Sequence, residues 1–96
     1  METPIWVIYY ETPYCAGFEW VNNQSDAEST YLDMVHRWED FPSEENWVVV
    51  RFKHNIPVIH GCIMGLIQSY IMNTSIADMI KNADEWASGS DFSLLG

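Results

Sequence analysis

The chain has 96 residues, a formal charge of −10 and an apolar content of 48%. A chain of this length typically forms one domain, so we expect a single domain over residues 1–96. The apolar content excludes a disordered acidic tail, and a count of two cysteines excludes a disulfide-dense secreted scaffold. The surplus of acids argues against direct binding of nucleic acid, because contacts with phosphates need lysine and arginine.

Two features predict a cytoplasmic protein that does not enter a membrane. The chain opens Met1-Glu-Thr-Pro4, without the positive charge and apolar run of a secretory signal. Residues 55–76 carry no charge, but their strongly apolar part is shorter than the roughly 20 residues that a spanning helix needs. This length favours a buried core helix.

Three segments read as strands. Residues 5–10 are β-branched and aromatic on both faces, which predicts a central strand that is covered on both sides. Residues 18–22 predict a second strand, paired with the first as a hairpin. Residues 47–53 predict a third strand, and Trp47 heads the face of it that ends in Arg51 and Lys53. We expect the far end of that face to be exposed to solvent and Trp47 to be partly exposed.

Helical periodicity follows the hairpin. Ser25-Asp-Ala-Glu28 is a capping-box pattern, and it predicts a helix from Ser25 to about Asp40. Apolar residues recur at helical spacing and predict its core face: Ala27, Tyr31, Met34, Val35, Trp38 and Phe41.

Two further helices are predicted after the third strand. The uncharged segment forms one over residues 58–72, and Ser75-Ile-Ala-Asp78 caps a last helix that runs to about Ala87. Residues 88–96 read as a loose C-terminal tail. The predicted order is β-β-α-β-α-α, an α+β fold in which a small three-stranded antiparallel or mixed sheet packs against helices in two layers.

The charge is concentrated in the N-terminal half, where residues 1–50 carry ten acids and one base. At 100° per residue, Asp26, Asp33 and Asp40 fall within about 40° of each other on the predicted helix. Glu39, Glu44 and Glu45 extend the acidic stretch around the end of that helix. One interpretation is a solvated face that aids solubility. The other is a surface complementary to a basic protein, whose arginines and lysines would bind carboxylates where they otherwise bind phosphates.

No strong catalytic or metal-binding motif appears, so we expect neither an enzyme nor a cofactor. His54, His60 and Cys62 lack the paired spacings and the fourth ligand of a structural zinc site. Cys15 lies in a predicted turn without a base nearby in the sequence, and a nucleophilic cysteine needs one. Among the tryptophans, Trp47 is the one we expect to serve as an interface anchor.

The N-terminal third of the chain resembles small acidic bacteriophage accessory proteins. The resemblance is carried by Trp6-Val-Ile-Tyr-Tyr-Glu-Thr-Pro-Tyr-Cys-Ala-Gly17, by the short strand after it and by Ser25-Asp-Ala-Glu28. The resemblance implies a phage protein that acts in the host bacterial cytoplasm as an anti-CRISPR or anti-restriction inhibitor. Some inhibitors of this class are DNA mimics. Such a protein would bind a basic nucleic-acid-binding protein or ribonucleoprotein.

The candidate contact residues for this function are Asp26, Asp33, Glu39, Asp40, Glu44, Glu45 and Trp47. The alternative is a bacterial immunity protein or antitoxin that neutralises a basic nuclease toxin. The sequence leaves open whether the protein is a monomer or a dimer.

Overall fold

The structure is a computed structural model that describes residues 2–12, 15–39, 47–57 and 63–89. Its elements follow in the order β1 (Glu2–Glu11), β2 (Ala16–Val21), α1 (Gln24–Glu39), β3 (Val48–Pro57), α2 (Ile63–Met72), α3 (Ile76–Lys81) and β4 (Glu85–Ser88). The strands of the described residues form one antiparallel sheet in the order β2-β1-β3-β4. The α+β class and the predicted β1–β2 hairpin are therefore confirmed.

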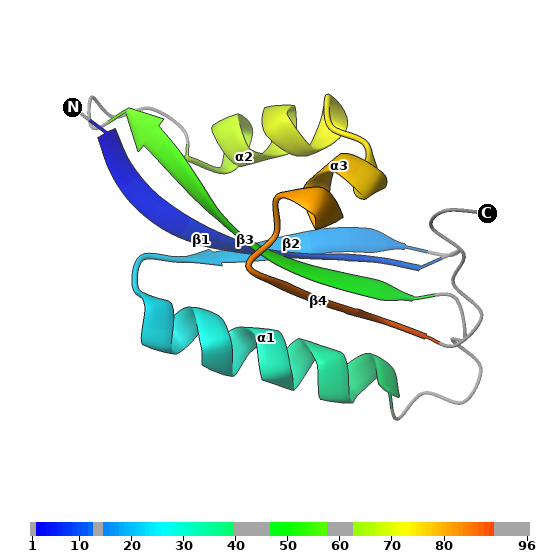
Figure 1. Cartoon of the computed structure of the whole chain (residues 1–96). Helices are drawn as coiled ribbons and strands as arrows, with labels where there is room; N and C mark the ends of the chain where they lie inside the picture. The colour runs from blue at the N-terminus through cyan, green and yellow to red at the C-terminus, as the bar shows by residue number, and fades with distance from the viewer. Residues whose placement is uncertain (1, 13–14, 40–46, 58–62, 90–96) are drawn as a thin grey trace.

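The sheet lies between two helical layers (Figure 1). Helix α1 covers one face, and α2 with α3 covers the other. The expected two-layer arrangement is therefore wrong. The reason lies in the central strands: β1 is apolar on both faces, and β3 buries Val48 and Val50 on one face and Val49 on the other, so both sides of the sheet need cover.

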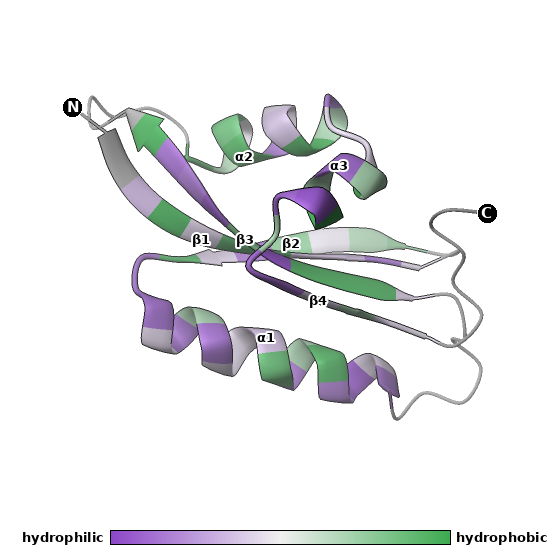
Figure 2. Ribbon diagram, in the orientation of Figure 1, coloured by the Kyte–Doolittle hydropathy of each residue, from purple (hydrophilic) through white to green (hydrophobic). Residues whose placement is uncertain are grey.

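Strand β1 supplies side chains to both helical layers, as its sequence predicts. Ile5, Val7 and Tyr9 belong to the core under α2 and α3, and Ile8 belongs to the core under α1. The α1-side core contains the following buried residues: Ile8, Ala27, Tyr31, Met34, Val35, Trp47 and Val49. The predicted apolar face of α1 is thus confirmed except at Phe41, which lies outside the described residues, and Figure 2 shows the purple and green bands of this amphipathic helix.

The cap of α1 lies two residues before the predicted capping box. The Asn23 side-chain oxygen accepts a hydrogen bond from the Asp26 backbone N–H at 2.8 Å, and Asn23 Nδ2 donates to Asp26 Oδ2 at 2.7 Å. The Asn23 side chain thus caps α1 in place of Ser25, and the Asp26 carboxylate accepts from that side chain.

The C-terminal part corrects the sequence prediction. The predicted cap of the last helix is confirmed, because the Ser75 side chain accepts from the Asp78 backbone N–H. That helix ends at Lys81, however, and residues 85–88 form the strand β4, so the expectation of a helix to Ala87 and of three strands is wrong. The Asp84 N–H donates to the Arg51 carbonyl oxygen at 2.8 Å, which places β4 against β3.

Helix α2 is described from Ile63. Residues 58–62 of the predicted helix lie outside the described residues, as do residues 90–96 of the predicted tail.

Candidate functional site

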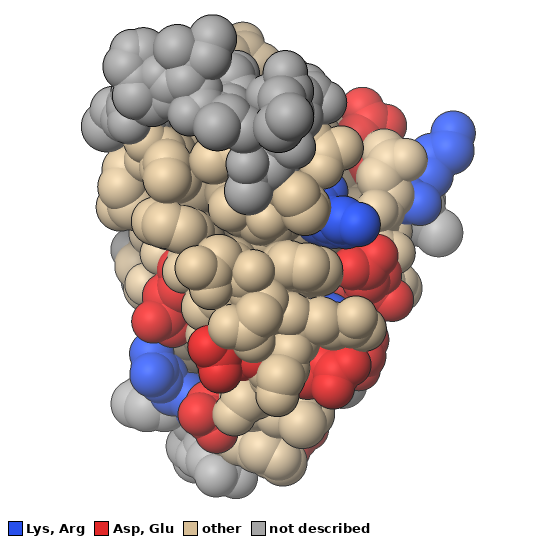
Figure 3. Space-filling view, turned by 90° about the vertical axis from the view of Figure 1, so that its left-hand side faces the viewer, with Lys and Arg blue, Asp and Glu red and all other residues tan. Residues whose placement is uncertain are grey.

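Acidic side chains gather on the side of the sheet that α1 covers. Figure 3 shows several of them on the lower part of one face, the part of the molecule that α1 occupies in Figure 1. Six described acids belong to this side, and all are exposed: Glu19, Asp26, Glu28, Asp33, Glu39 and Glu85. The concentration of acids that the sequence predicts around this helix is therefore present in the fold.

Helical geometry separates the acids of α1 into two flanks. Asp26 and Asp33 are seven residues apart, so they lie within about 20° of each other and about 10.5 Å apart along the axis. Neither forms an ion pair with a described basic residue; Asp26 accepts only from Asn23, and Arg37 makes no ion pair with Asp33 within the described residues. We call Asp26 and Asp33 the acidic flank of α1.

The acids on the other flank of α1 each have a nitrogen partner. Glu28 Oε1 lies 3.8 Å from Arg51 Nη1, and Glu39 Oε1 lies 3.5 Å from His36 Nδ1. Glu39 is exposed like Asp26 and Asp33, but it lies about 120° around the helix axis from Asp33 and so belongs to a different flank. Asp40, Glu44 and Glu45 lie outside the described residues.

Arg51 is buried between α1 and the sheet, with its side chain 9% exposed. Its guanidinium lies 5.8 Å from the centre of the Tyr31 ring, and Nη2 lies 3.5 Å from Glu85 Oε1. Burial, with a smaller contribution from the Glu85 carboxylate, raises the pKa of Tyr31 to about 12, while Arg51 acts in the opposite direction. Arg51 thus joins α1, β3 and β4 and is not offered to a partner.

Trp47 does not belong to the site. It is 6% exposed and packs in the α1-side core with Met34 and Val35, so the expectation of a partly exposed anchor is wrong. The physical reason is that α1 covers this end of the strand face, whereas the solvent-exposed part of that face holds Lys53 and Asn55. Trp86 on the edge strand β4 is the exposed tryptophan instead, at 43%.

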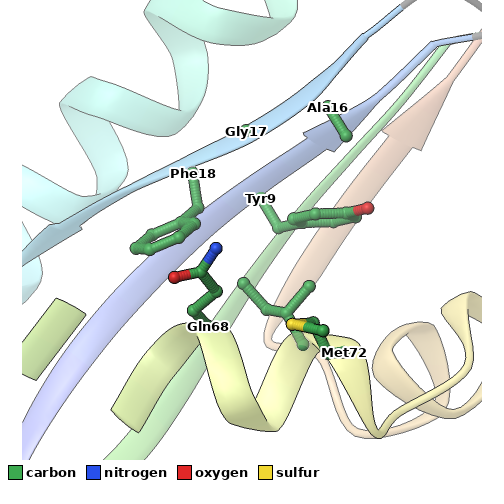
Figure 4. A pocket seen from close by; sticks show the side chains of 7 residues that line it. Tyr9, Ala16, Gly17, Phe18, Gln68 and Met72 are labelled. Atoms are coloured by element: carbon green, nitrogen blue, oxygen red, sulfur yellow. The ribbon is translucent and has the colours of Figure 1, made fainter. Parts of the chain in front are cut away.

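A groove that the sequence did not predict lies on the opposite side of the sheet, between β2 and α2. It has a volume of about 200 Å³, and its lining comes from Tyr9, Ala16, Gly17, Phe18, Gln68, Ile71 and Met72. Figure 4 shows Gln68 and Met72 of α2 turned toward Phe18 and Tyr9 of the sheet. Periodicity places apolar residues on α2 but gives no indication that β2 lies across from it, so the sequence offered no signal for this groove.

The histidine and cysteine that the sequence analysis considered as catalytic or metal-binding residues, and that the structure describes, make contacts within the fold. The His54 ring lies 4.7 Å from that of Tyr70, which connects β3 to α2. Cys15 is exposed, and its backbone N–H donates to Thr12 Oγ1 at 3.0 Å. Within the described residues no group of three or more potential ligands is placed to hold a metal ion, and His60 and Cys62 lie outside them.

None of the described helices combines the length and the apolar character needed to cross a membrane. Comparisons of the chain with protein-family models, curated proteins and solved structures found no match.

Proposed function

We propose that this protein is a non-enzymatic inhibitor of the anti-CRISPR or anti-restriction kind. It would bind a basic nucleic-acid-binding protein or ribonucleoprotein through the α1 side and occlude the surface that otherwise holds DNA or RNA. The proposal includes neither catalysis nor a cofactor. The observation that carries it is the acidic flank, two exposed carboxylates on one line of a helix that form no ion pair with a described basic residue.

Electrostatics supports this role for the flank. A formal charge of −10 on 96 residues destabilises the folded state through self-repulsion. Asp33 contributes to that repulsion and caps no helix, whereas Asp26 also serves the N-terminus of α1. Exposed carboxylates accept charge-assisted hydrogen bonds from arginine and lysine as phosphates do, so a pair of them without an ion-pair partner among the described residues suits a basic partner.

The first test is capture from a bacterial lysate, followed by competition with DNA for the captured protein. We expect a partner with a basic groove, displacement by DNA, and binding that weakens as salt is added. Recovery solely of partners without a basic surface, or binding that DNA does not affect, would contradict the proposal. Capture of a basic nuclease toxin would instead favour the immunity-protein alternative.

The second test uses charge reversal with a matched control. Asp33→Lys changes the acidic flank, and Asp78→Lys makes the same change of charge at an exposed acid on α3, across the sheet. We expect Asp33→Lys to weaken binding about tenfold at low salt, because charges near an interface steer association and exclude wrong partners. Asp78→Lys should stay within about threefold, since Debye screening weakens the more distant charge.

The kinetics of Asp33→Lys distinguish two versions of the proposal. A slower association with unchanged dissociation means that the flank steers the partner, while a faster dissociation means that Asp33 contacts it. Equal effects of Asp33→Lys and Asp78→Lys would show that only net charge matters and would remove the flank from the site.

A further inference from the structure

Strand β2 forms an open edge of the sheet. The strand order places β1 on its inner side, and within the described residues no strand pairs with its outer side. None of its six residues is buried. It contains no lysine or proline and has no bulge in its register with β1, three devices that protect an edge from pairing, and its one charged residue is Glu19.

We propose that this edge of β2 binds an extended segment of a partner protein as an added strand, and that the segment alternates basic and apolar residues. This strand addition goes beyond the proposed function, because the β2 edge and the groove beside it support it whether or not the α1 side binds a basic protein. Strand addition at β2 can fail while binding through the α1 side holds, and the reverse.

The register shows which backbone groups face outward. The Thr12 N–H donates to the Cys15 carbonyl oxygen at 2.8 Å, so these two residues are a hydrogen-bonded pair at the end of the hairpin. Hydrogen-bonded and non-bonded pairs alternate along an antiparallel ladder. The non-bonded positions of β2 are then Ala16, Phe18 and Trp20, whose N–H and C=O groups point away from β1. Among the described residues no group bonds to them, so they can pair with an incoming strand.

The same three residues turn their side chains toward α2. Ala16 and Phe18 line the groove, and Trp20 packs partly against the core on that side. Across the groove, Met72 is 78% exposed, and α2 carries no charged residue. An added strand would place every second side chain beside this wall, where apolar residues bury Met72 and Phe18 and charged residues would be desolvated.

The remaining side chains of the added strand would face the α1 side. There the exposed Glu19 occupies the middle of β2, opposite Ile8 in the register. Glu28 contacts Arg51 in β3, so the acidic flank of Asp26 and Asp33 lies on the side of α1 away from β4, toward the β2 edge. Lysine or arginine opposite Glu19 is a favourable cross-strand pair. A second copy of this chain is disfavoured, because it would bring two −10 molecules together.

The test uses a synthetic peptide that alternates lysine and valine (KVKVKVKVK), with amide hydrogen exchange as the readout. We expect new protection of the Ala16, Phe18 and Trp20 amides and little change at Gly17, Glu19 and Val21, which already pair with β1. A scrambled peptide of the same composition (KKKVVVVKK) keeps the charge without the alternation and should give no such pattern. Equal protection by both peptides, or no binding of the alternating one at about millimolar concentration, would overturn the inference.

Two variants at one exposed position provide the matched control. Ala16→Pro removes an outward N–H without breaking a ladder bond to β1, and Ala16→Val keeps that N–H. We expect Ala16→Pro to weaken peptide binding about tenfold and Ala16→Val to stay within about threefold. Thermal unfolding of both variants verifies the fold. Equal affinities for the two variants would exclude backbone pairing at this edge.

Discussion

Tyr10 and Gly17 face each other across the β1–β2 ladder, and the tyrosine ring covers the glycine. A Cβ atom on Gly17 would lie 2.6 Å from the Tyr10 hydroxyl oxygen and 2.9 Å from the ring carbons Cε1 and Cζ. The Tyr10 ring also packs against that of Trp38, with ring centres 5.4 Å apart. The absent side chain at position 17 therefore makes the room that this aromatic pair fills.

Gly17→Ala should destabilise the protein by about 1–3 kcal/mol, because the Tyr10 ring must leave its position against Trp38. Urea unfolding measures the loss. In a Tyr10→Ala background the same substitution should be neutral or slightly stabilising, since nothing then occupies the space. An equal cost in both backgrounds would show that the glycine is needed for its backbone and not for the ring.

Arg51→Ala should cost about 2 kcal/mol, mainly through lost packing of its aliphatic stem under α1. Arg51→Met keeps that stem and should be nearly neutral, because Nε and Nη1 make no hydrogen bond with the described residues.

Glu28→Gln and Glu85→Gln should each cost under about 1 kcal/mol, since both carboxylates are about half exposed. Chemical denaturation of the four variants checks the order. A large loss in Arg51→Met would mean that the ion pairs, and not packing, join α1 to the sheet.

Stability should fall as the pH rises from about 10 to about 12. Unfolded Tyr31 releases its proton near pH 10, whereas burial, then Glu85, raises the pKa of the folded residue to about 12. The unfolded state then binds fewer protons than the folded state, so raising the pH favours unfolding. The contribution of Tyr31 is fully present below pH 10 and should have fallen by about 2 kcal/mol at about pH 11.5.

Tyr31→Phe is the control for this pH dependence, because it keeps the ring over Arg51 and removes the ionisable group. The variant should lose less stability than the natural chain between about pH 9 and pH 11.5 in urea titrations. Tyr9 contributes in the same direction in both proteins, since burial and its hydrogen bond to Glu11 raise its pKa. Parallel pH profiles for the two proteins would contradict the assignment to Tyr31.

Asn23→Ala should destabilise α1 by about 1 kcal/mol, because its side chain accepts from the Asp26 N–H. Ser25→Ala should change stability by no more than about 0.5 kcal/mol, since Ser25 lies inside the helix and is exposed. Thermal unfolding of the pair decides between the observed cap and the capping box that the sequence predicts. A larger loss at Ser25 would favour the latter.

Elements with a strong local signal could be predicted from the sequence. The hydrophobic pattern of α1 identifies its buried face, and the apolar run in β1 identifies a strand covered on both sides. The cap at Ser75 is also visible, because it depends on residues three positions apart. The positions of the α1 acids follow from the same helical spacing, whereas Glu19 and Glu85 come to that side through strand pairing.

Features that depend on distant segments could not be predicted. Residues 85–88 are continuous with a helical pattern, yet they form a strand because β3 offers a free edge and the Asp84 N–H finds the Arg51 carbonyl. Trp47 is buried because α1 reaches that end of the strand face, which alternation along a strand does not reveal. The groove between β2 and α2 joins residues about 50 positions apart in the chain, so no local pattern could indicate it.

The central pair of the sheet has a consequence for synthesis of the chain on the ribosome. Residues 2–11 pair with residues 48–57 along the whole length of β1. The edge of β1 that faces β3 therefore stays unpaired until more than half of the chain has been synthesised. Until then the apolar faces of the hairpin and α1 remain exposed, which is the situation in which chaperones bind nascent chains. Folding is therefore expected to complete late, when Val48–Pro57 has left the exit tunnel, and a chain truncated before that strand should aggregate.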